Sequence, residues 1–127
     1  MFKFSQRSIE RMNGVDSRLI AIAHRALELS KVDFGIPEFG GLRTTEQQNY
    51  LHTLGKSNCD GINDVSKHQR GVALDVYAYV DGAASWQMEH LTTVAAAMLQ
   101  AASEQQVKLA WGGHWINFID APHFELV

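Results

Sequence analysis

The sequence predicts a small α+β domain, in which helices pack against an antiparallel sheet. Apolar residues recur at helical spacing in two long segments, whereas short runs rich in β-branched and aromatic residues lie between and after them. These segments do not alternate regularly, which disfavours a doubly wound parallel sheet. With 127 residues, 46% of them hydrophobic, we expect a single domain over 1–127 with one core.

The first long helix is predicted to begin after Asp16, because aspartate is a good N-cap residue. Its buried face repeats at helical spacing and comprises Leu19, Ile22, Ala23, Ala26 and Leu27. After this helix, residues 33–43 contain several glycines and a proline. We therefore expect irregular backbone or a short strand there.

A second helix is predicted next, between a capping box and a glycine stop. Two overlapping pairs have capping-box spacing, namely Thr44 with Gln47 and Thr45 with Gln48. Gly55 is a typical residue just beyond a helix end. Residues 56–67 are polar and predict a loop.

The second half of the chain predicts one more helix and several strands. Val72–Val80 is rich in valine, alanine, leucine and tyrosine and is typical of a buried strand. A third helix is expected from Ser85, with a core-facing side formed by Leu91, Val94, Ala95, Met98, Leu99 and Ala102. The remaining strands are predicted at Val107–Trp111, Trp115–Ile119 and His123–Val127, with Gly112-Gly113 as a turn.

Charge and composition exclude several classes of function. The net charge is −3 and the isoelectric point is about 6.0, so nothing favours nucleic-acid binding. No apolar run suggests a membrane span or a secretory signal, and we expect a protein made soluble in the cytoplasm without stable membrane association. The single cysteine, Cys59, excludes an internal disulfide and is predicted to be a loop thiol.

A first candidate metal-binding stretch runs from Ser66 to Asp75. His68 and Asp75 are both good zinc ligands, but neither a helix nor a flat strand brings residues seven apart together on one ion. Gly71 lies between them and permits a bend. We therefore expect His68 in the loop before a strand and Asp75 pointing inward from that strand.

A second stretch, Asp120–Glu125, contains the remaining groups of a possible metal site. Pro122 predicts a turn or a strand entry and so disfavours a helix interior. His123 is a candidate third ligand, and Asp120 a candidate base beside the open position. The alternative interpretation makes His68 a polar loop residue, Asp75 a hydrogen-bonding residue at a strand end and Asp120 a turn former.

Both stretches together resemble the zinc peptidases that include D-alanyl-D-alanine carboxypeptidases and dipeptidases and the phage L-alanyl-D-glutamate endopeptidases. The shared pattern is Ser66-x-His68-x-x-Gly71-x-Ala73-x-Asp75, followed by Asp120-x-Pro122-His123-Phe124. Further matches to the phage branch are Asp33-Phe34, Gly41–Gln47, Leu54–Ser57, Trp111-Gly112-Gly113-x-Trp115 and Phe118. The resemblance extends from about residue 16 to the end and implies a hedgehog/D,D-peptidase-like fold, with the metal site on the antiparallel sheet.

The resemblance also implies roles for individual residues. His68, Asp75 and His123 match the zinc ligands, and Asp120 matches the carboxylate that acts as general base and then general acid. Arg43 matches an arginine that stabilises the polarised carbonyl or a substrate carboxylate, a role suited to a permanently charged guanidinium.

Substrate contacts are expected from Ser66, from Gln48 or its neighbour Gln47, and from Trp115. For Trp115, as for Trp111, a core position is the alternative. His114 departs from the phage pattern, which usually has an acidic residue there. We expect it to be a neutral variation, the alternatives being an altered cleft charge or an extra metal ligand.

The implied function is zinc-dependent cleavage of the L-alanyl-D-glutamate bond in the peptidoglycan stem peptide, by a phage or prophage endolysin. D-Alanyl-D-alanine cleavage by the same groups and a non-catalytic, virion-associated wall-binding domain are the alternatives. No separate wall-binding domain is expected. By analogy, we expect a monomer that accumulates in the host cytoplasm and reaches the wall after a membrane breach, for instance by a holin.

Overall fold

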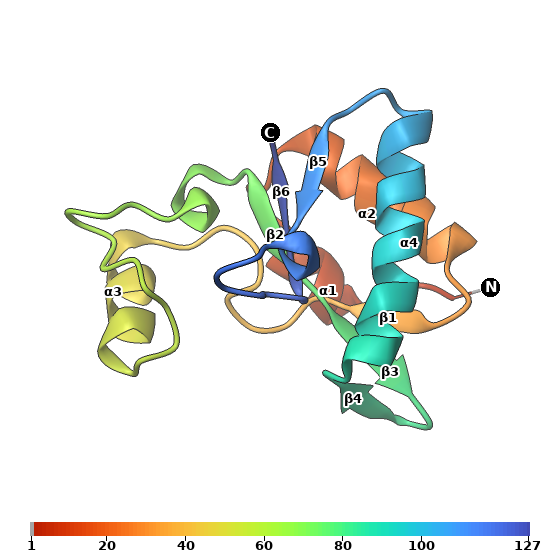
Figure 1. Ribbon diagram of the computed structural model, residues 1–127, viewed down its shortest axis with the longest axis horizontal. Helices are drawn as coiled ribbons and strands as arrows, with labels where there is room; N and C mark the ends of the chain where they lie inside the picture. The colour runs from red at the N-terminus through yellow and green to blue at the C-terminus, as the bar shows by residue number, and fades with distance from the viewer. Residues whose placement is uncertain (1) are drawn as a thin grey trace.

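The computed structural model describes residues 2–127 and contains four α-helices, two short 3₁₀ helices and six strands in that part of the chain (Figure 1). The α-helices are α1 (Gln6–Arg11), α2 (Ser17–Leu29), α3 (Thr45–Thr53) and α4 (Met88–Glu104). The 3₁₀ helices are η1 (Lys67–Arg70) and η2 (Gly112–His114). The strands are β1 (Asp33–Gly35), β2 (Ala73–Asp75), β3 (Tyr77–Val80), β4 (Ala83–Ser85), β5 (Leu109–Trp111) and β6 (His123–Leu126).

The strands form two antiparallel sheets, which confirms the predicted α+β class. One sheet has the order β1-β3-β4 and the other the order β2-β6-β5. The predicted single strand Val72–Val80 is wrong, because the chain passes from one sheet to the other at Val76. Asp75 pairs with His123 in the second sheet, whereas Tyr77 pairs with Gly35 in the first. The Val76 amide bonds to the Pro122 carbonyl instead of to a strand partner.

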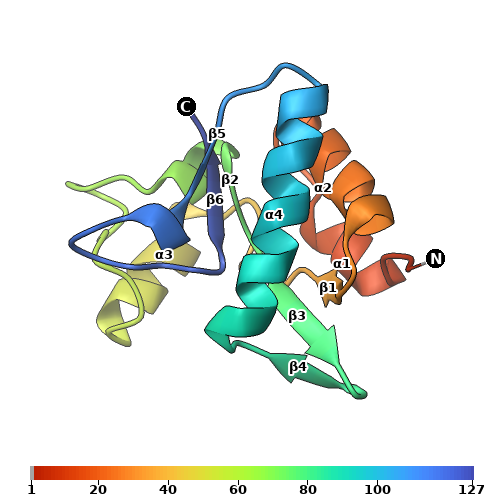
Figure 2. The same ribbon diagram turned by 45° about the vertical axis from the view of Figure 1, so that its right-hand side comes forward.

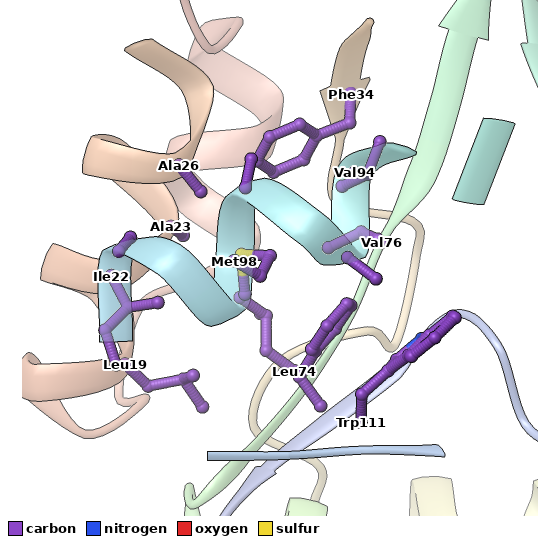
Figure 3. Packing of buried hydrophobic residues seen from close by; sticks show 14 of the residues in the cluster. Leu19, Ile22, Ala23, Ala26, Phe34, Leu74, Val76, Val94, Met98 and Trp111 are labelled. Carbon is purple, nitrogen blue, oxygen red and sulfur yellow. The ribbon is translucent and has the colours of Figure 1, made fainter. Parts of the chain in front are cut away.

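The buried hydrophobic residues form one cluster, in which α2 and α4 pack side by side and α4 contacts β3 of one sheet and β5 of the other (Figures 1 and 2). Met98 and Val94 of α4 lie between α2 and the strands, close to Leu74 and Val76 (Figure 3). By contrast, α3 lies apart from these helices, at the side of the molecule that carries the long loop 54–66 (Figure 1). The second sheet is thus supported from behind by the core.

Two of the three predicted helices begin where the sequence predicts, and the second also ends there. The Asp16 side chain accepts a hydrogen bond from the Arg18 amide at the start of α2. Thr44 and Gln47 form the capping box of α3, which decides between the two predicted pairs, and Gly55 follows this helix with a φ of 75°. The short helix α1 was not predicted.

The third helix begins later than predicted. Ser85 ends β4, and α4 starts at Met88. The Ser85 hydroxyl group bonds to Nδ1 of His90 and accepts from the Gln87 amide, so it links the hairpin to the helix start. The hairpin β3–β4 turns at Asp81-Gly82, where both residues have positive φ.

The predicted strand Trp115–Ile119 is also wrong. This segment is a loop in which Ile116 is 93% exposed and Phe118 and Ile119 are exposed as well. Its residues have strand propensity, but no neighbouring strand is available to pair with them. In the described part of the chain, no helix has the length and apolar character needed to cross a membrane.

Candidate metal centre and catalytic cleft

Three predicted ligands converge from two elements of the second sheet and the turn before it. Asp75 at the end of β2 and His123 at the start of β6 are register partners, so their side chains lie next to each other. His68 approaches from η1. Its Nε2 lies 3.3 Å from Asp75 Oδ1 and 3.3 Å from Nδ1 of His123. The remaining side of the triangle, from His123 Nδ1 to Asp75 Oδ1, is 3.1 Å.

This triangle has the size that a tetrahedral ion requires. Metal–ligand bonds of roughly 2.0–2.1 Å at tetrahedral angles separate the ligand atoms by about 3.3–3.4 Å. The three measured separations agree with this value to within a few tenths of an ångström. His68, Asp75 and His123 can therefore hold a metal ion without rearrangement.

The outer nitrogens of both imidazoles show why a cation suits the triangle. Nδ1 of His68 lies 3.0 Å from the Gly41 carbonyl, and Nε2 of His123 lies 2.8 Å from Glu125 Oε1. A carbonyl and a carboxylate only accept hydrogen bonds, so each of these nitrogens carries the proton. In the neutral rings, the inner nitrogens therefore present lone pairs to each other and to Asp75. Three acceptors that face one another require a bound cation or a proton.

The close approach of the three side chains shifts the pKa values of Asp75 and His123. Burial alone would raise the pKa of Asp75, but hydrogen bonds from His123 and His68 hold that pKa well below its usual range. Burial alone would lower the pKa of His123, yet the Asp75 and Glu125 carboxylates raise it above the ordinary histidine value. Without a metal, His123 therefore holds a proton more readily than an ordinary histidine.

The position of His68 depends on local backbone signals around η1. Ser66 caps this turn by accepting from the His68 amide, and the Gln69 side chain accepts from the Ser66 amide in return. Gly71 ends the turn with a φ of 72°, and a Cβ atom there would lie 2.8 Å from the Gly14 carbonyl oxygen. The expected bend at Gly71 is confirmed, and His68 lies in a 3₁₀ turn rather than in an open loop.

Asp120 ends the segment 112–120, and the two ends of this segment lie directly against each other. Its amide donates to the Gly112 carbonyl at 3.0 Å, and the two backbones are so close that any Cβ at Gly112 would overlap the Asp120 carbonyl oxygen. The Trp111 indole secures the same base by donating to the Ala121 carbonyl at 2.7 Å. The Asp120 carbonyl then accepts from the His123 amide, so one turn positions both side chains.

The environment of Asp120 favours a carboxyl group that accepts protons. Burial raises the pKa of Asp120, and the nearby Asp75 carboxylate raises it further, against the opposing charges of His123, His68 and Arg43. Asp120 lines the same cleft as His68, Asp75 and His123, although its oxygens are not among the three converging ligand atoms.

Arg43 is held rigidly at the edge of the triangle. Its Nε donates to the Phe39 carbonyl at 2.7 Å, and one terminal nitrogen donates to Asp75 Oδ2 at 3.2 Å. The other terminal nitrogen donates to Gln48 Oε1 at 2.9 Å. The Arg43 amide also bonds to the His68 carbonyl, which joins this segment to η1.

The geometry gives no support to the predicted substrate contact of Gln48, which does not line the cleft. Gln48 is completely buried, and its amide nitrogen donates to the Ser57 hydroxyl and to the Cys59 carbonyl. With its oxygen bonded to Arg43, both polar atoms are engaged inside the protein. Gln48 therefore orients Arg43. The alternative candidate, Gln47, belongs to the capping box of α3 and lines a separate depression.

The triangle opens into a cleft with a volume of about 370 Å³. Its lining comprises Arg43, Lys56–Cys59, Val65–His68, Asp75, Trp115, Phe118, Asp120, His123 and Glu125. Trp115 packs against His123 with ring centroids 5.2 Å apart and forms part of the wall, whereas Trp111 is 93% buried in the core. Ser66 lines the cleft while it caps η1.

The structure also shows the surroundings of Cys59 and His114. The Cys59 thiol lies in a loop, as predicted, and it is partly buried at the cleft. His114 packs edge-on against Trp111 at 4.8 Å, outside the cleft lining and outside the ligand triangle. Its position agrees with the interpretation as a neutral variation.

The model of the family described as phage L-alanyl-D-glutamate peptidase matches residues 1–127. The chain belongs to this family. Within this peptidase family, it is 36% identical over 115 residues to the L-alanyl-D-glutamate peptidase of Escherichia phage T5, a match that spans 90% of this chain and 82% of the relative. A crystal structure of the Serratia marcescens L-Ala D-Glu endopeptidase ChiX superposes with a TM-score of 0.86 at 34% identity. That superposition covers 99% of this chain and 90% of the other.

Membership of the L-alanyl-D-glutamate peptidase family confirms the predicted class of protein, a peptidase. Sequence reasoning missed two groups that support the site, Glu125 and Lys67. Glu125 bonds to His123, and its second oxygen pairs with Lys67 Nζ at 2.6 Å. The signal was present in the sequence, because Glu125 is two residues beyond His123 and side chains two apart on a strand share a face.

Proposed function

We propose that this protein is a zinc-dependent L-alanyl-D-glutamate endopeptidase that cleaves the peptidoglycan stem peptide. The main support for this proposal is the triangle of acceptor atoms from His68, Asp75 and His123, with the carboxyl group of Asp120 beside it. Two imidazoles and one carboxylate form a typical catalytic zinc set, which leaves a fourth position for water or substrate. A purely structural zinc site would have no use for a neighbouring base.

A zinc ion in this triangle supplies Lewis acidity toward the scissile carbonyl and the attacking water. Asp120 would accept the proton of that water, because its carboxyl group lies in the cleft beside the triangle and is not itself one of the converging ligands. The same carboxyl group then returns the proton to the departing amine of D-glutamate. The hydrogen bond from the Asp120 amide to the Gly112 carbonyl keeps Asp120 in place for both proton transfers.

Arg43 stabilises the oxyanion that develops on the alanyl carbonyl. Three of its five N–H groups are bound to Phe39, Gln48 and Asp75, so the guanidinium is fixed while its remaining donors are left over for substrate. Fixed donors that need no reorganisation are an effective form of electrostatic stabilisation. The bond from Arg43 to Asp75 Oδ2 also fixes the orientation of that carboxylate.

The biological role that fits this chemistry is that of an endolysin. The family and the phage relative support peptidoglycan as the substrate. We further propose that the protein acts as a monomer, accumulates in the host cytoplasm and reaches the wall after the membrane is breached, for instance by a holin.

Product identification tests the proposal directly. Purified muropeptides are incubated with the zinc-loaded protein, with the protein after chelation, and with the protein reloaded with zinc. Mass spectrometry should show a new D-glutamyl amino terminus only in the first and third reactions. Release of terminal D-alanine with the L-alanyl bond intact would support the carboxypeptidase alternative instead. Full activity after verified metal removal would contradict the zinc mechanism.

A further inference from the structure

The cleft is lined by loop residues of two different chemical characters. Residues 56–59, which follow α3, contribute Lys56, Ser57, Asn58 and Cys59. The loop after η2 contributes the aromatic side chains of Trp115 and Phe118. A substrate bound at the metal site therefore meets a basic, polar segment and an apolar segment.

Three cations line the cleft, and two of them are already paired. Arg43 donates to Asp75, and Lys67 pairs with Glu125 at 2.6 Å. Lys56 is exposed, and none of the ion pairs among residues 2–127 includes it. Lys56 is thus the cleft cation whose charge remains available for a ligand.

The carboxylates of the cleft do not compete for Lys56. Asp75 is bonded to the histidines and Arg43, and Glu125 is bound by His123 and Lys67. Among residues 2–127, no ion pair joins Asp120 to Lys56. An anionic group on the substrate is therefore the partner that complements Lys56.

The substrate of the proposed reaction carries such a group next to the scissile bond. D-Glutamate continues the stem peptide through its γ-carboxyl group, so its α-carboxylate is free and lies one carbon from the nitrogen that is released. The alanyl residue on the other side of the bond has only a methyl side chain. The two halves of the substrate thus differ in polarity in the same way as the two cleft segments.

Resting on the proposed function, we infer that Lys56 binds the free α-carboxylate of D-glutamate and so sets the direction of the substrate in the cleft. The glutamyl half lies along residues 56–59, and the alanyl half lies toward Trp115 and Phe118. Lys56 is then a specificity residue, because it distinguishes a stem peptide with a free α-carboxylate from one in which this group is an amide.

The test uses two N-acetylmuramyl peptides that are identical except at this group, one with D-glutamate and one with D-isoglutamine. Three zinc-loaded proteins are compared, namely the wild type, Lys56→Met and Lys31→Met. Lys31 is exposed at the end of α2 and lines a different depression, so it controls for the loss of one positive charge. Zinc content and thermal midpoints are measured for all three.

The wild type and Lys31→Met should prefer the carboxylate peptide by about fivefold in kcat/KM, the ratio expected for an exposed ion pair. Lys56→Met should cleave both peptides at the rate that the wild type shows with the amide. Added salt should reduce the preference of the wild type, since exposed charges are screened.

Equal rates on the two peptides in the wild type, or an unchanged preference in Lys56→Met, would overturn this inference while the endopeptidase function stands. An equal loss of preference in Lys31→Met would also overturn it, because the effect would then come from long-range charge. Failure of the wild type to cleave either peptide would remove the proposed function together with the inference.

Discussion

Nε2 of His123 lies 2.8 Å from the Glu125 carboxylate, whose other oxygen pairs with Lys67 at 2.6 Å. This contact keeps the proton on the outer nitrogen of the ring, and the inner nitrogen faces His68 and Asp75. Burial would raise the pKa of Glu125, but Lys67 and His123 hold it below the ordinary glutamate value. Glu125 thus remains ionised and can control the direction and basicity of the histidine.

Replacing Glu125 should weaken metal binding without altering the ligands. Glu125→Gln removes the charge, and the loss of a carboxylate partner of a metal-bound histidine typically lowers metal affinity by about 10–100-fold. Competition with a chromophoric chelator measures the change. Glu38→Gln, at an exposed position outside the cleft, is the matched control. Equal zinc affinity in Glu125→Gln and the wild type would rule out this role.

Asp120→Asn should separate metal binding from turnover. The amide has nearly the same shape, and Asp120 does not belong to the ligand triangle, so zinc affinity should change little. Activity should fall by about 10²–10⁴-fold, the usual contribution of a positioned acid or base. Metal analysis and muropeptide turnover are measured on the same samples. A variant that binds zinc and retains full turnover would contradict the assignment of Asp120 as the base.

Zinc affinity should decline as the pH falls through neutrality. The pKa of His123 is raised above its ordinary value, and zinc binds only the neutral ring, so protons compete with the metal at and below that raised pKa. Chelator competition between about pH 8 and about pH 5 follows this effect across the histidine range. His114→Gln should show the same profile as the wild type, since His114 packs on Trp111 away from the ligands. A flat profile would be inconsistent with His123 as a ligand.

Gln48→Leu tests whether this buried amide orients Arg43. The change removes the hydrogen bonds that Gln48 makes to one terminal nitrogen of Arg43, to the Ser57 hydroxyl and to the Cys59 carbonyl, which should lower the free energy of unfolding by about 1–3 kcal/mol. Urea denaturation measures this loss. In the folded fraction, kcat should fall more than KM changes, because Gln48 does not reach the substrate. A variant with an unchanged kcat and a raised KM would favour the direct contact that the sequence suggested.

Local sequence signals were sufficient to predict the three longer helices. Asp16 predicted the start of α2, and two overlapping capping-box pairs, Thr44–Gln47 and Thr45–Gln48, predicted the start of α3 to within one residue. The apolar pattern predicted most of the buried faces of α2 and α4. These features depend on residues within one or two helical turns of each other. The motif residues His68, Asp75, Asp120 and His123 were likewise recognised from their types and order.

Strand partners could not be predicted in this way. The run Val72–Val80 has uniform strand propensity, yet it divides at Val76 because β6 and β1 are different neighbours on either side. The segment Trp115–Ile119 has equal propensity and forms no strand. Pairing depends on which distant segments approach, and propensity carries no record of that.

The sequence by itself determined which residues are candidates for metal ligands and for proton transfer, and the glycine and proline that allow the backbone to bend. Only the tertiary structure decided that Gln48 faces inward to Arg43, that Lys67 pairs with Glu125 behind His123, and that Lys56 forms no ion pair among the described residues. Each of these outcomes depends on burial and on partners up to 58 positions away, as for Lys67 and Glu125. Contacts between residues so far apart in the chain are set by the packing of α4 against both sheets and against α2, which no local pattern encodes.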